Sequence, residues 1–293
     1  MCTAISTAIN QHYFGRTLDV ECSYGESVIV TPRRFPLRFC HAGRSDKHYS
    51  ILGVAHVAGG VPLYYDGINE HGLCAAALRF ADACSYSDNP VSSLRLAPFE
   101  VIPYILSSFR CVDEVRSALR SIAITDDAFS ETMPNQPLHY MIADARGCII
   151  LEPMHGGVSI YDNVSRIMTN APALTRQLDS LKNLGAPRFD DFSSEARFFR
   201  ACYAAERMPS ESARDVMRIM NTVSVPQGFV KGDGNAYHRT VYTAVMDSRN
   251  RSYTFVTEDS AIPFTVTLCN EASDADGIVI FPTSGFGREV RLN

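Results

Sequence analysis

The chain of 293 residues has no cluster of lysine and arginine and no long apolar run. Its 27 basic and 32 acidic residues give a formal net charge of −5. Because nucleic-acid phosphates are bound by clustered cations, this balance argues against a nucleic-acid partner. No segment approaches the roughly 18 to 20 consecutive apolar residues that span a bilayer, so we expect no membrane partner either.

Motifs that bind common cofactors and metals are also missing. The sequence contains no G-x-S-x-G, no H-E-x-x-H, no P-loop and no C-x-x-C. This argues against the serine hydrolases, zincins, nucleoside triphosphatases and thioredoxin-like enzymes that such motifs reveal. Cys40 and His41 are the only adjacent pair of soft ligands, and we interpret them as structural. The sequence therefore predicts neither a metal nor a cofactor.

The sequence does contain enough apolar material for a large core, with 46% hydrophobic and 20% charged residues. The length alone is compatible with one domain or two. No proline- or serine-rich linker and no internal repeat interrupts the chain, so we predict a single domain over residues 1–293.

Nine cysteines could indicate a disulfide scaffold, but the number is odd and the chain is far longer than the small secreted domains that need cross-links. Free thiols are the better interpretation. The first residues lack the charged and apolar regions of an export signal. We therefore expect a cytoplasmic protein with reduced cysteines.

Hydrophobic periodicity predicts runs of strands that alternate with blocks of helices. The expected helices cover residues 112–122 and 194–205, and a third begins at Ser212. The expected strands cover residues 2–9, 12–15, 27–31, 49–57, 72–78, 139–143, 148–152, 158–161, 167–169, 240–246, 252–257, 264–268 and 278–281. This order favours antiparallel sheets covered by separate helices over a doubly wound parallel sheet.

Cys2 is the residue with the most chemical information. Methionine before a small residue is the type that is removed after translation, and removal of Met1 would leave the thiol and the α-amine on one residue. An α-amine with a pKa of about 7.7 to 8.0 can accept the thiol proton near neutral pH. Position alone also fits a small residue that merely follows the initiator.

Four segments favour the catalytic interpretation, because they resemble motifs of the choloylglycine hydrolase family and occur in the same order along the chain. These segments are Met1–Thr3, Phe14–Asp19, Asp66–Leu73 and Met168–Pro172. The family consists of N-terminal-nucleophile (Ntn) amidases and includes bile salt hydrolases and penicillin V acylases. The resemblance implies an α+β fold, a four-layer αββα sandwich of two antiparallel sheets between helical layers.

The resemblance also implies roles near the opening hairpin. Cys2 would be the nucleophile at the start of the first strand. Asp19, expected just after the second strand, would hold the amine and thiol of the cysteine. Arg16 would lie close to the nucleophile, where a cation favours thiolate. The alternative for Arg16 and Asp19 is a simple ion pair at the end of the hairpin.

Two further residues take roles from the resemblance. Asn170 would donate its side-chain amide to the oxyanion of the tetrahedral intermediate, a contact that contributes a few kcal/mol. Without that role, an asparagine before Ala-Pro is typical of a turn. Arg197 would be the arginine of the family's later active-site segment, and the alternative is an exposed helix residue.

The sequence departs from the family at Arg79, where bile salt hydrolases usually carry asparagine and penicillin V acylases tyrosine. Its backbone N–H could still complete the oxyanion hole. Its side chain would either bind an anionic part of the substrate or pair with a carboxylate such as Asp66.

The segment between Asn170 and Arg197 is also shorter than in bile salt hydrolases, where it helps assemble tetramers. This leaves open a homo-oligomer with a shortened assembly segment.

The sequence thus predicts an amidohydrolase of linear N-acyl amides, with a small-molecule substrate. Conjugated bile salts are the first expected substrates, and penicillin V or another N-acyl amide is the alternative. A hypothesis from another class is a thiol-rich binding or redox protein without hydrolytic activity.

Overall fold

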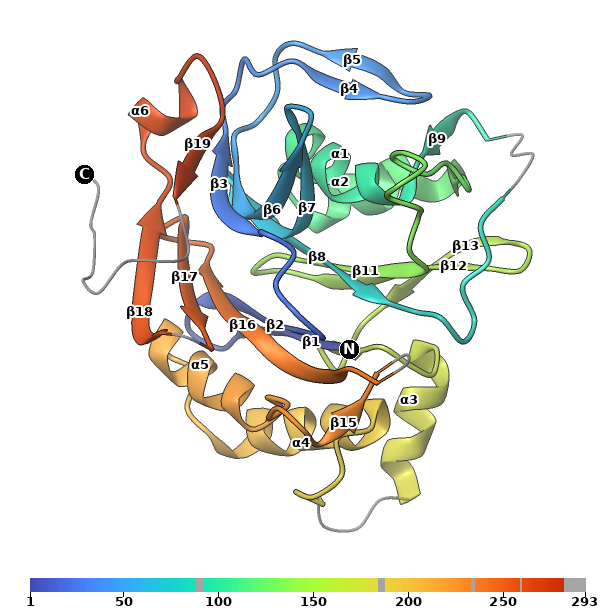
Figure 1. Ribbon diagram of the computed structural model, residues 1–293, viewed down its shortest axis with the longest axis vertical. Helices are drawn as coiled ribbons and strands as arrows, with labels where there is room; N and C mark the ends of the chain where they lie inside the picture. Colours follow the sequence, from blue (N-terminus) through green and yellow to red (C-terminus); the bar gives the residue numbers. More distant parts are fainter. Residues whose placement is uncertain (88–91, 184–187, 233–234, 259, 282–293) are drawn as a thin grey trace.

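The computed structural model describes residues 1–87, 92–183, 188–232, 235–258 and 260–281. Two antiparallel sheets face each other and carry helices on their outer sides (Figure 1). The first sheet has the strand order β14 (Ile167–Thr169), β1 (Cys2–Ala8), β2 (His12–Val20), β16 (Tyr237–Asp247), β17 (Ser252–Thr257) and β18 (Ser260–Thr267), and β15 (Val230–Lys231) pairs with β16.

The second sheet is built in the same antiparallel manner. Its strand order is β13 (Gly157–Asp162), β12 (Cys148–Met154), β11 (Leu138–Ala143), β8 (Cys74–Arg79), β7 (Val61–Asn69), β6 (Ile51–Ala58), β3 (Ser27–Thr31) and β19 (Val279–Phe281). Two short pairs lie outside the sheets: antiparallel β4 (Leu37–Phe39) with β5 (Gly43–Ser45), and parallel β9 (Leu94–Leu96) with β10 (Ile122–Ile124).

Helices cover the outer face of each sheet (Figure 1). The helices of the described residues are α1 (Val101–Ser108), α2 (Val112–Ala118), α3 (Leu174–Ser180), α4 (Ser194–Arg207), α5 (Ala213–Asn221) and the short α6 (Asn270–Ser273). Helices α1 and α2 pack on the second sheet, whereas α4 and α5 pack on the first. None of the helices in the described ranges is long and apolar enough to cross a membrane.

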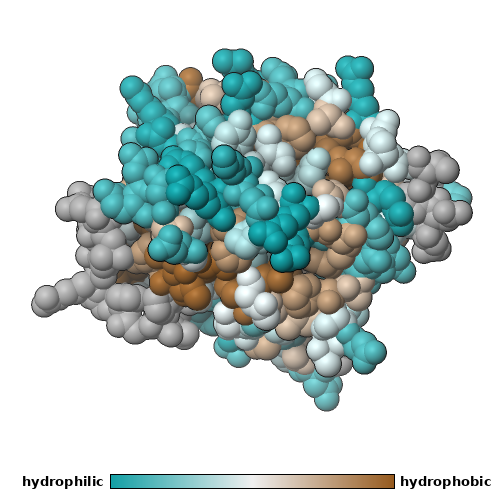
Figure 2. Space-filling model, turned by 90° about the horizontal axis from the view of Figure 1, so that it is seen from above, coloured by the Kyte–Doolittle hydropathy of each residue, from teal (hydrophilic) through white to brown (hydrophobic). Residues whose placement is uncertain are grey.

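Three apolar layers hold these elements together. One lies between the sheets and includes Phe14, Val54 and Ile150. The second lies between the second sheet and helices α1 and α2, and the third between the first sheet and helices α4 and α5. Polar side chains cover much of the face seen from above, with apolar side chains gathered near its middle (Figure 2). The predicted αββα sandwich is confirmed.

Most predicted strands are present, and β3 and β17 have the predicted ends. The predicted helix over 112–122 is too long, because α2 ends at Ala118 and a 3₁₀ turn leads into β10 at Ile122. Strand β2 is much longer than predicted. It continues to Val20, so Asp19 lies within the strand and not after it.

The opening hairpin places Arg16 beside Cys2. Strands β1 and β2 pair Cys2 with Leu18 and Ala4 with Arg16. Side chains at alternate positions of a strand share a face, so Cys2, Ala4 and Arg16 all point into the layer between the sheets. Residues at the intervening positions face the other way, and among them the Asp19 carboxylate lies 3.7 Å from Arg197 of α4.

His12, the first residue of β2, makes the stability of the protein depend on pH. Its ring nitrogens lie 2.9 Å from Ser6 Oγ and 2.5 Å from Ser248 Oγ. Burial, helped by the charge of Arg166, lowers the pKa of His12 from 6.5 to about 4. Between these values the unfolded chain binds the proton and the folded chain does not, so stability is lost as the pH falls from 6.5 to 4, by up to about 3 kcal/mol.

We therefore expect urea unfolding of the His12→Asn variant to lose less stability over this pH range than the wild type does. The exposed His155, replaced by asparagine, is the matched control and should leave the slope unchanged. An equal loss of stability in wild type and His12→Asn would contradict the assignment.

Candidate active site

Cys2 is the first residue of β1, and its side chain is 4% exposed. Its Sγ lies 3.6 Å from Arg16 Nη2. Its backbone nitrogen donates to Asn170 Oδ1 at 2.6 Å, and its carbonyl accepts from Arg197 Nη1 at 2.6 Å. Arg16 from the neighbouring strand, Asn170 from the end of β14 and Arg197 from α4 therefore meet at Cys2.

Arg16 is buried and paired with Asp66 of the opposite sheet. Its Nη1 donates to Asp66 Oδ2 at 2.8 Å, and its Nη2 donates to the Ala77 carbonyl at 3.3 Å. Burial lowers the pKa of Arg16, but its contacts with Tyr242, Cys2 and Asp66 outweigh burial and raise that pKa above its ordinary value. The guanidinium beside the thiol therefore keeps its charge, and the alternative ion pair of Arg16 with Asp19 is wrong.

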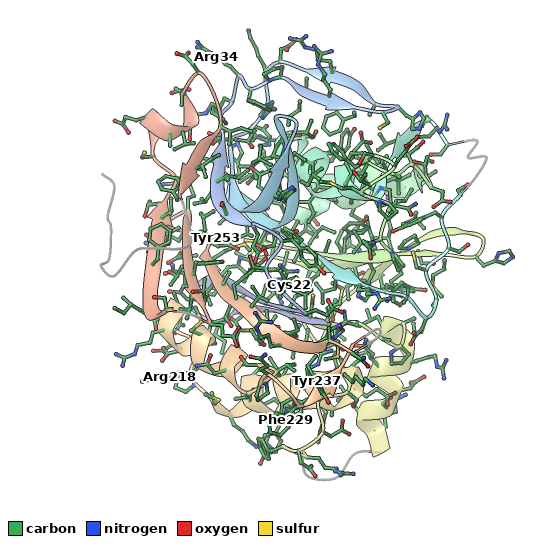
Figure 3. All side chains as sticks on the ribbon, viewed as in Figure 1. Cys22, Arg34, Arg218, Phe229, Tyr237 and Tyr253 are labelled. Atoms are coloured by element: carbon green, nitrogen blue, oxygen red, sulfur yellow. The ribbon has the colours of Figure 1, made fainter. Side chains whose placement is uncertain are left out.

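Asp66 joins Arg16 to two buried tyrosines, and sequence reasoning missed this role. The Tyr242 hydroxyl donates to Asp66 Oδ2 at 2.5 Å, and the Tyr253 hydroxyl donates to Oδ1. Burial raises the pKa of both tyrosines well above the usual value, and the nearby Asp66 adds to the effect, so both hydroxyls stay protonated. Figure 3 shows Tyr253 pointing into the space between the sheets.

Arg197 is fully buried in the first turn of α4, so the alternative of an exposed helix residue is wrong. Besides Cys2, its Nη1 donates to Thr3 Oγ1 at 2.7 Å, and its Nη2 donates to Asn170 Oδ1 at 2.8 Å. Burial lowers the pKa of Arg197, against the opposing effect of Asp19, whose Oδ2 lies 3.7 Å from Nη1. Arg197 thus fixes both the start of β1 and the Asn170 amide.

Asp19 lies on the face of β2 opposite to Arg16. Its carboxylate accepts from Thr240 Oγ1 at 2.6 Å and from Thr17 Oγ1 at 3.3 Å. Its backbone, in contrast, contacts Met1: the Asp19 nitrogen donates to the Met1 carbonyl at 2.8 Å, and the Met1 nitrogen donates to the Asp19 carbonyl. The residue expected to hold the cysteine amine therefore lies beside the start of the chain.

Asn170 directly follows β14, and its side-chain amide has one defined orientation. Its Oδ1 accepts from Cys2 and from Arg197, which only an oxygen can do. Its Nδ2 must then be the atom that donates to the Arg79 carbonyl at 2.9 Å. A primary amide nitrogen carries a second hydrogen, and this hydrogen remains available to a ligand.

Arg79 ends β8, and its side chain is exposed. The next residue, Phe80, donates its N–H to the Pro137 carbonyl. Because neighbouring residues of an antiparallel ladder point to alternate sides, the N–H and C=O of Arg79 both point away from β11 and towards Asn170. The proposed pairing of Arg79 with Asp66 is wrong, since the buried Asp66 carboxylate is held by Arg16, Tyr242 and Tyr253.

These contacts combine a thiol, a permanent cation beside it, and the Asn170 amide, which joins Cys2 to the end of β8. Such an arrangement can stabilise a thiolate and then an oxyanion formed by attack on a carbonyl. Three threonines support the site: Thr3 and Thr17 are buried, and Thr240 is partly buried. They carried no sequence signal, because a threonine in a strand looks like any other strand residue.

Comparison with known proteins gives a consistent result. A family model described as linear amide C–N hydrolases, choloylglycine hydrolase family, matches residues 2–189 and 180–281. The bile salt hydrolase/transferase of Lactiplantibacillus plantarum is 32% identical, over 96% of this chain and 97% of the relative. The conjugated bile acid hydrolase of Lactobacillus gasseri is 27% identical, over 96% of this chain and 100% of the relative.

Two solved structures share the fold. A variant of conjugated bile acid hydrolase from Clostridium perfringens superposes with a TM-score of 0.90 at 24% identity, covering 100% of this chain and 99% of the other. Penicillin V acylase from Agrobacterium tumefaciens gives a TM-score of 0.80 at 23% identity, covering 96% and 91%.

Proposed function

Because this chain belongs to the choloylglycine hydrolase family of linear amide C–N hydrolases, we propose that Cys2 is its nucleophile and conjugated bile salts are its substrates. The observation that carries the proposal is the set of contacts around Cys2, whose thiol, nitrogen and carbonyl are each held by a different partner. Its bile-acid part is supported by the relatives from Lactiplantibacillus plantarum and Lactobacillus gasseri, which are named for bile salts.

The proposed reaction begins after Met1 has been removed. The free α-amine of Cys2 accepts the thiol proton, and Sγ attacks the amide carbonyl while the charge of Arg16 favours the thiolate. The oxyanion accepts hydrogen bonds from Asn170 Nδ2 and the Arg79 N–H. The tetrahedral intermediate then expels the amine, which takes its proton from the Cys2 ammonium.

The second half of the reaction regenerates the enzyme. The α-amine accepts a proton from water as the water attacks the thioester, and the same two N–H groups stabilise the second oxyanion. The thioester C–S bond breaks, the acid leaves, and the thiol regains its proton. This sequence needs no catalytic histidine.

Intact mass and a substrate panel test the proposal. We expect the purified protein to lack Met1, and one equivalent of a thiol reagent on Cys2 to abolish hydrolysis. Among glycocholate, taurocholate and penicillin V, a bile salt should give the highest kcat/KM. Retention of Met1 would falsify the mechanism, and preference for penicillin V would replace the proposed substrate. Hydrolysis that survives full labelling of Cys2 would exclude this residue as the nucleophile, and a complete lack of hydrolysis would favour the thiol-rich binding or redox protein.

The exposed side chain of Arg79 is proposed to bind the anionic end of the substrate. The Arg79→Asn variant should lose about tenfold in kcat/KM on glycine and taurine conjugates, with little change on an uncharged amide of the same acyl group, because only the charged ligands lose an ion pair. Steady-state kinetics on matched amides measure this. An unchanged preference for charged over uncharged amides would exclude the role.

The location and assembly of the protein are also proposals. All nine cysteines lie in the described residues and are free thiols, which supports a reducing compartment such as the cytoplasm. The shortened segment between Asn170 and Arg197 includes residues 184–187, which lie outside the described residues. Light scattering of the purified protein tests whether a homo-oligomer forms.

A further inference from the structure

His139 and Glu152 are two buried titratable residues that the proposed reaction does not use. They are neighbours across the pair of strands β11 and β12, and their side chains are 0% and 1% exposed. His139 Nδ1 lies 3.5 Å from Glu152 Oε1. Because side chains alternate along a strand, both residues share the face of Met141 and Ile150, which packs between the two sheets. The pair is therefore in the layer that also contains Cys2.

Each member of the pair contacts a different segment of the chain beside the proposed oxyanion hole. The His139 ring stacks on Phe80, which directly follows β8, with ring centroids 4.4 Å apart and planes 6° from parallel. Glu152 Oε1 accepts from the Leu174 N–H at 2.9 Å, at the start of α3, the helix that follows Asn170. The pair thus joins the end of β8 to the turn between β14 and α3.

These are the two segments that supply the proposed oxyanion donors. The Arg79 N–H is at the end of β8 in the second sheet, and the Asn170 amide follows β14 in the first. The segments meet where Asn170 Nδ2 donates to the Arg79 carbonyl at 2.9 Å. Since the donors come from different sheets, the distance between them depends on what holds these segments together. His139 and Glu152 provide such a connection.

Packing alone does not explain why this connection is polar. Within the described residues, the two ring nitrogens of His139 and Oε2 of Glu152 have no hydrogen-bond partner from the protein. Burial lowers the pKa of His139, against the opposing effects of Glu152 and the Thr169 backbone, so the ring is neutral at neutral pH. Burial of an imidazole and a carboxyl group with so few partners costs free energy that two apolar side chains would not. Such a cost is typical of a functional site.

We propose that His139 and Glu152 are positioning residues, which hold Arg79 and Asn170 at the separation that the oxyanion requires. The inference rests on the proposed function, since it assumes that the N–H groups of these two segments bind the oxyanion. A misplacement of about 1 Å in a catalytic group can cost about 100-fold in rate. Loss of the connection should therefore slow the reaction, with little effect on substrate affinity or on the Cys2 thiol.

The His139→Phe variant tests the connection, because the new ring keeps the stack on Phe80 and lacks the contact with Glu152. On the amide that the substrate panel shows to be cleaved, we expect kcat to fall at least about tenfold, with KM and the rate of Cys2 alkylation within about twofold of wild type. Alkylation forms no oxyanion, so it reports on the thiol alone. Wild-type kcat in the folded variant would overturn the inference, and so would an equal fall in alkylation.

Replacements of Glu152 provide a conservative control. Glu152→Gln keeps an acceptor for Leu174 and a polar contact for His139, so it should retain at least about half of the wild-type kcat, whereas Glu152→Leu should lose at least about tenfold. Tyr140→Phe removes a buried hydroxyl that donates to the Pro98 carbonyl at 2.8 Å on the opposite face of β11, and should leave kcat unchanged. Equal kcat in the glutamine and leucine variants would contradict a positioning role.

An Asn170 variant separates this inference from the proposed function. Asn170→Ala should lower kcat about 100-fold, and addition of His139→Phe should then lower it by less than about twofold, because the donor that His139 positions is already absent. A further tenfold loss would show that His139 acts elsewhere and would overturn the inference. Wild-type kcat in Asn170→Ala would mean that the proposed oxyanion hole itself is wrong.

Discussion

Replacement of Cys2 by alanine is expected to lower kcat/KM by at least about 10⁴-fold, because no other group in the site can form the covalent intermediate. The fold should survive. Cys2 lies in the layer between the sheets, and loss of one buried sulfur atom costs about 1 kcal/mol. Steady-state kinetics and thermal unfolding of the same preparation measure the two effects.

Cys74 provides the matched control for this substitution. It is buried in the same layer between the sheets, and burial raises its pKa far above the usual value, so it stays a neutral thiol. The Cys74→Ala variant should lose a similar amount of stability and keep its activity. Equal loss of activity in both variants would show that the Cys2 effect comes from damage to the core, and full activity of Cys2→Ala would rule out the nucleophile.

The strands that the sequence placed with the right ends carry a clear strand pattern. Strand β17 alternates between buried and partly exposed residues, and β3 is a short run of β-branched residues. The predicted strand over residues 12–15 ended too early. Nearly all of β2 is buried on both faces, so no alternation marks the residues after Gly15. Helix α1 was missed for a similar reason, since it is apolar on most sides and contains Pro103.

Helix α4 shows a different limit of sequence patterns. Hydropathy placed Phe198, Cys202 and Ala205 on its buried face. The structure buries Phe198 but also two arginines, Arg197 and Arg200, which hydropathy assigns to solvent. Their burial depends on acceptors from distant segments, such as the Cys2 carbonyl for Arg197. The family resemblance, which matches motifs, identified Arg197 where periodicity could not.

Neither hydrophobic periodicity nor the family resemblance identified Asp66 as the partner of Arg16. Arg16 and Asp66 are 50 residues apart and belong to different sheets, so their contact exists only once the sheets have stacked. Tyr242 and Tyr253 join them from a third part of the chain. In the sequence these four residues are separate polar positions in strands. They become one cluster only when the two sheets pack together.

The second large effect is expected in the Asp66→Asn variant, which removes the negative charge from this cluster. Arg16 is 1% exposed, so removing its counter-ion leaves a buried charge uncompensated, which destabilises a protein by about 3 to 5 kcal/mol. The Arg16 guanidinium would also lose its anchor beside the Cys2 thiol, so kcat should fall. Urea unfolding and the rate of Cys2 alkylation at neutral pH measure these effects, and we expect the displaced guanidinium to slow alkylation.

Three further variants separate the role of the charge from that of packing. Glu70→Gln makes the same change in the partly exposed Arg33–Glu70 pair and should cost no more than about 1 kcal/mol. Tyr253→Phe removes one donor to Asp66, keeps the ion pair and should cost about 1 to 2 kcal/mol. Arg16→Met combined with Asp66→Leu should regain most of the stability lost in Asp66→Asn, because apolar residues replace a buried ion pair at little cost.

Activity distinguishes the double variant from a simple rescue of folding. Without the cation beside Sγ, alkylation of Cys2 should stay slow at neutral pH although the protein is stable. A stable double variant with wild-type alkylation and turnover would mean that Asp66 and Arg16 serve only the fold. A stable but inactive one would mean that the buried ion pair is retained for the thiol that it faces, at a cost in stability that apolar packing would avoid.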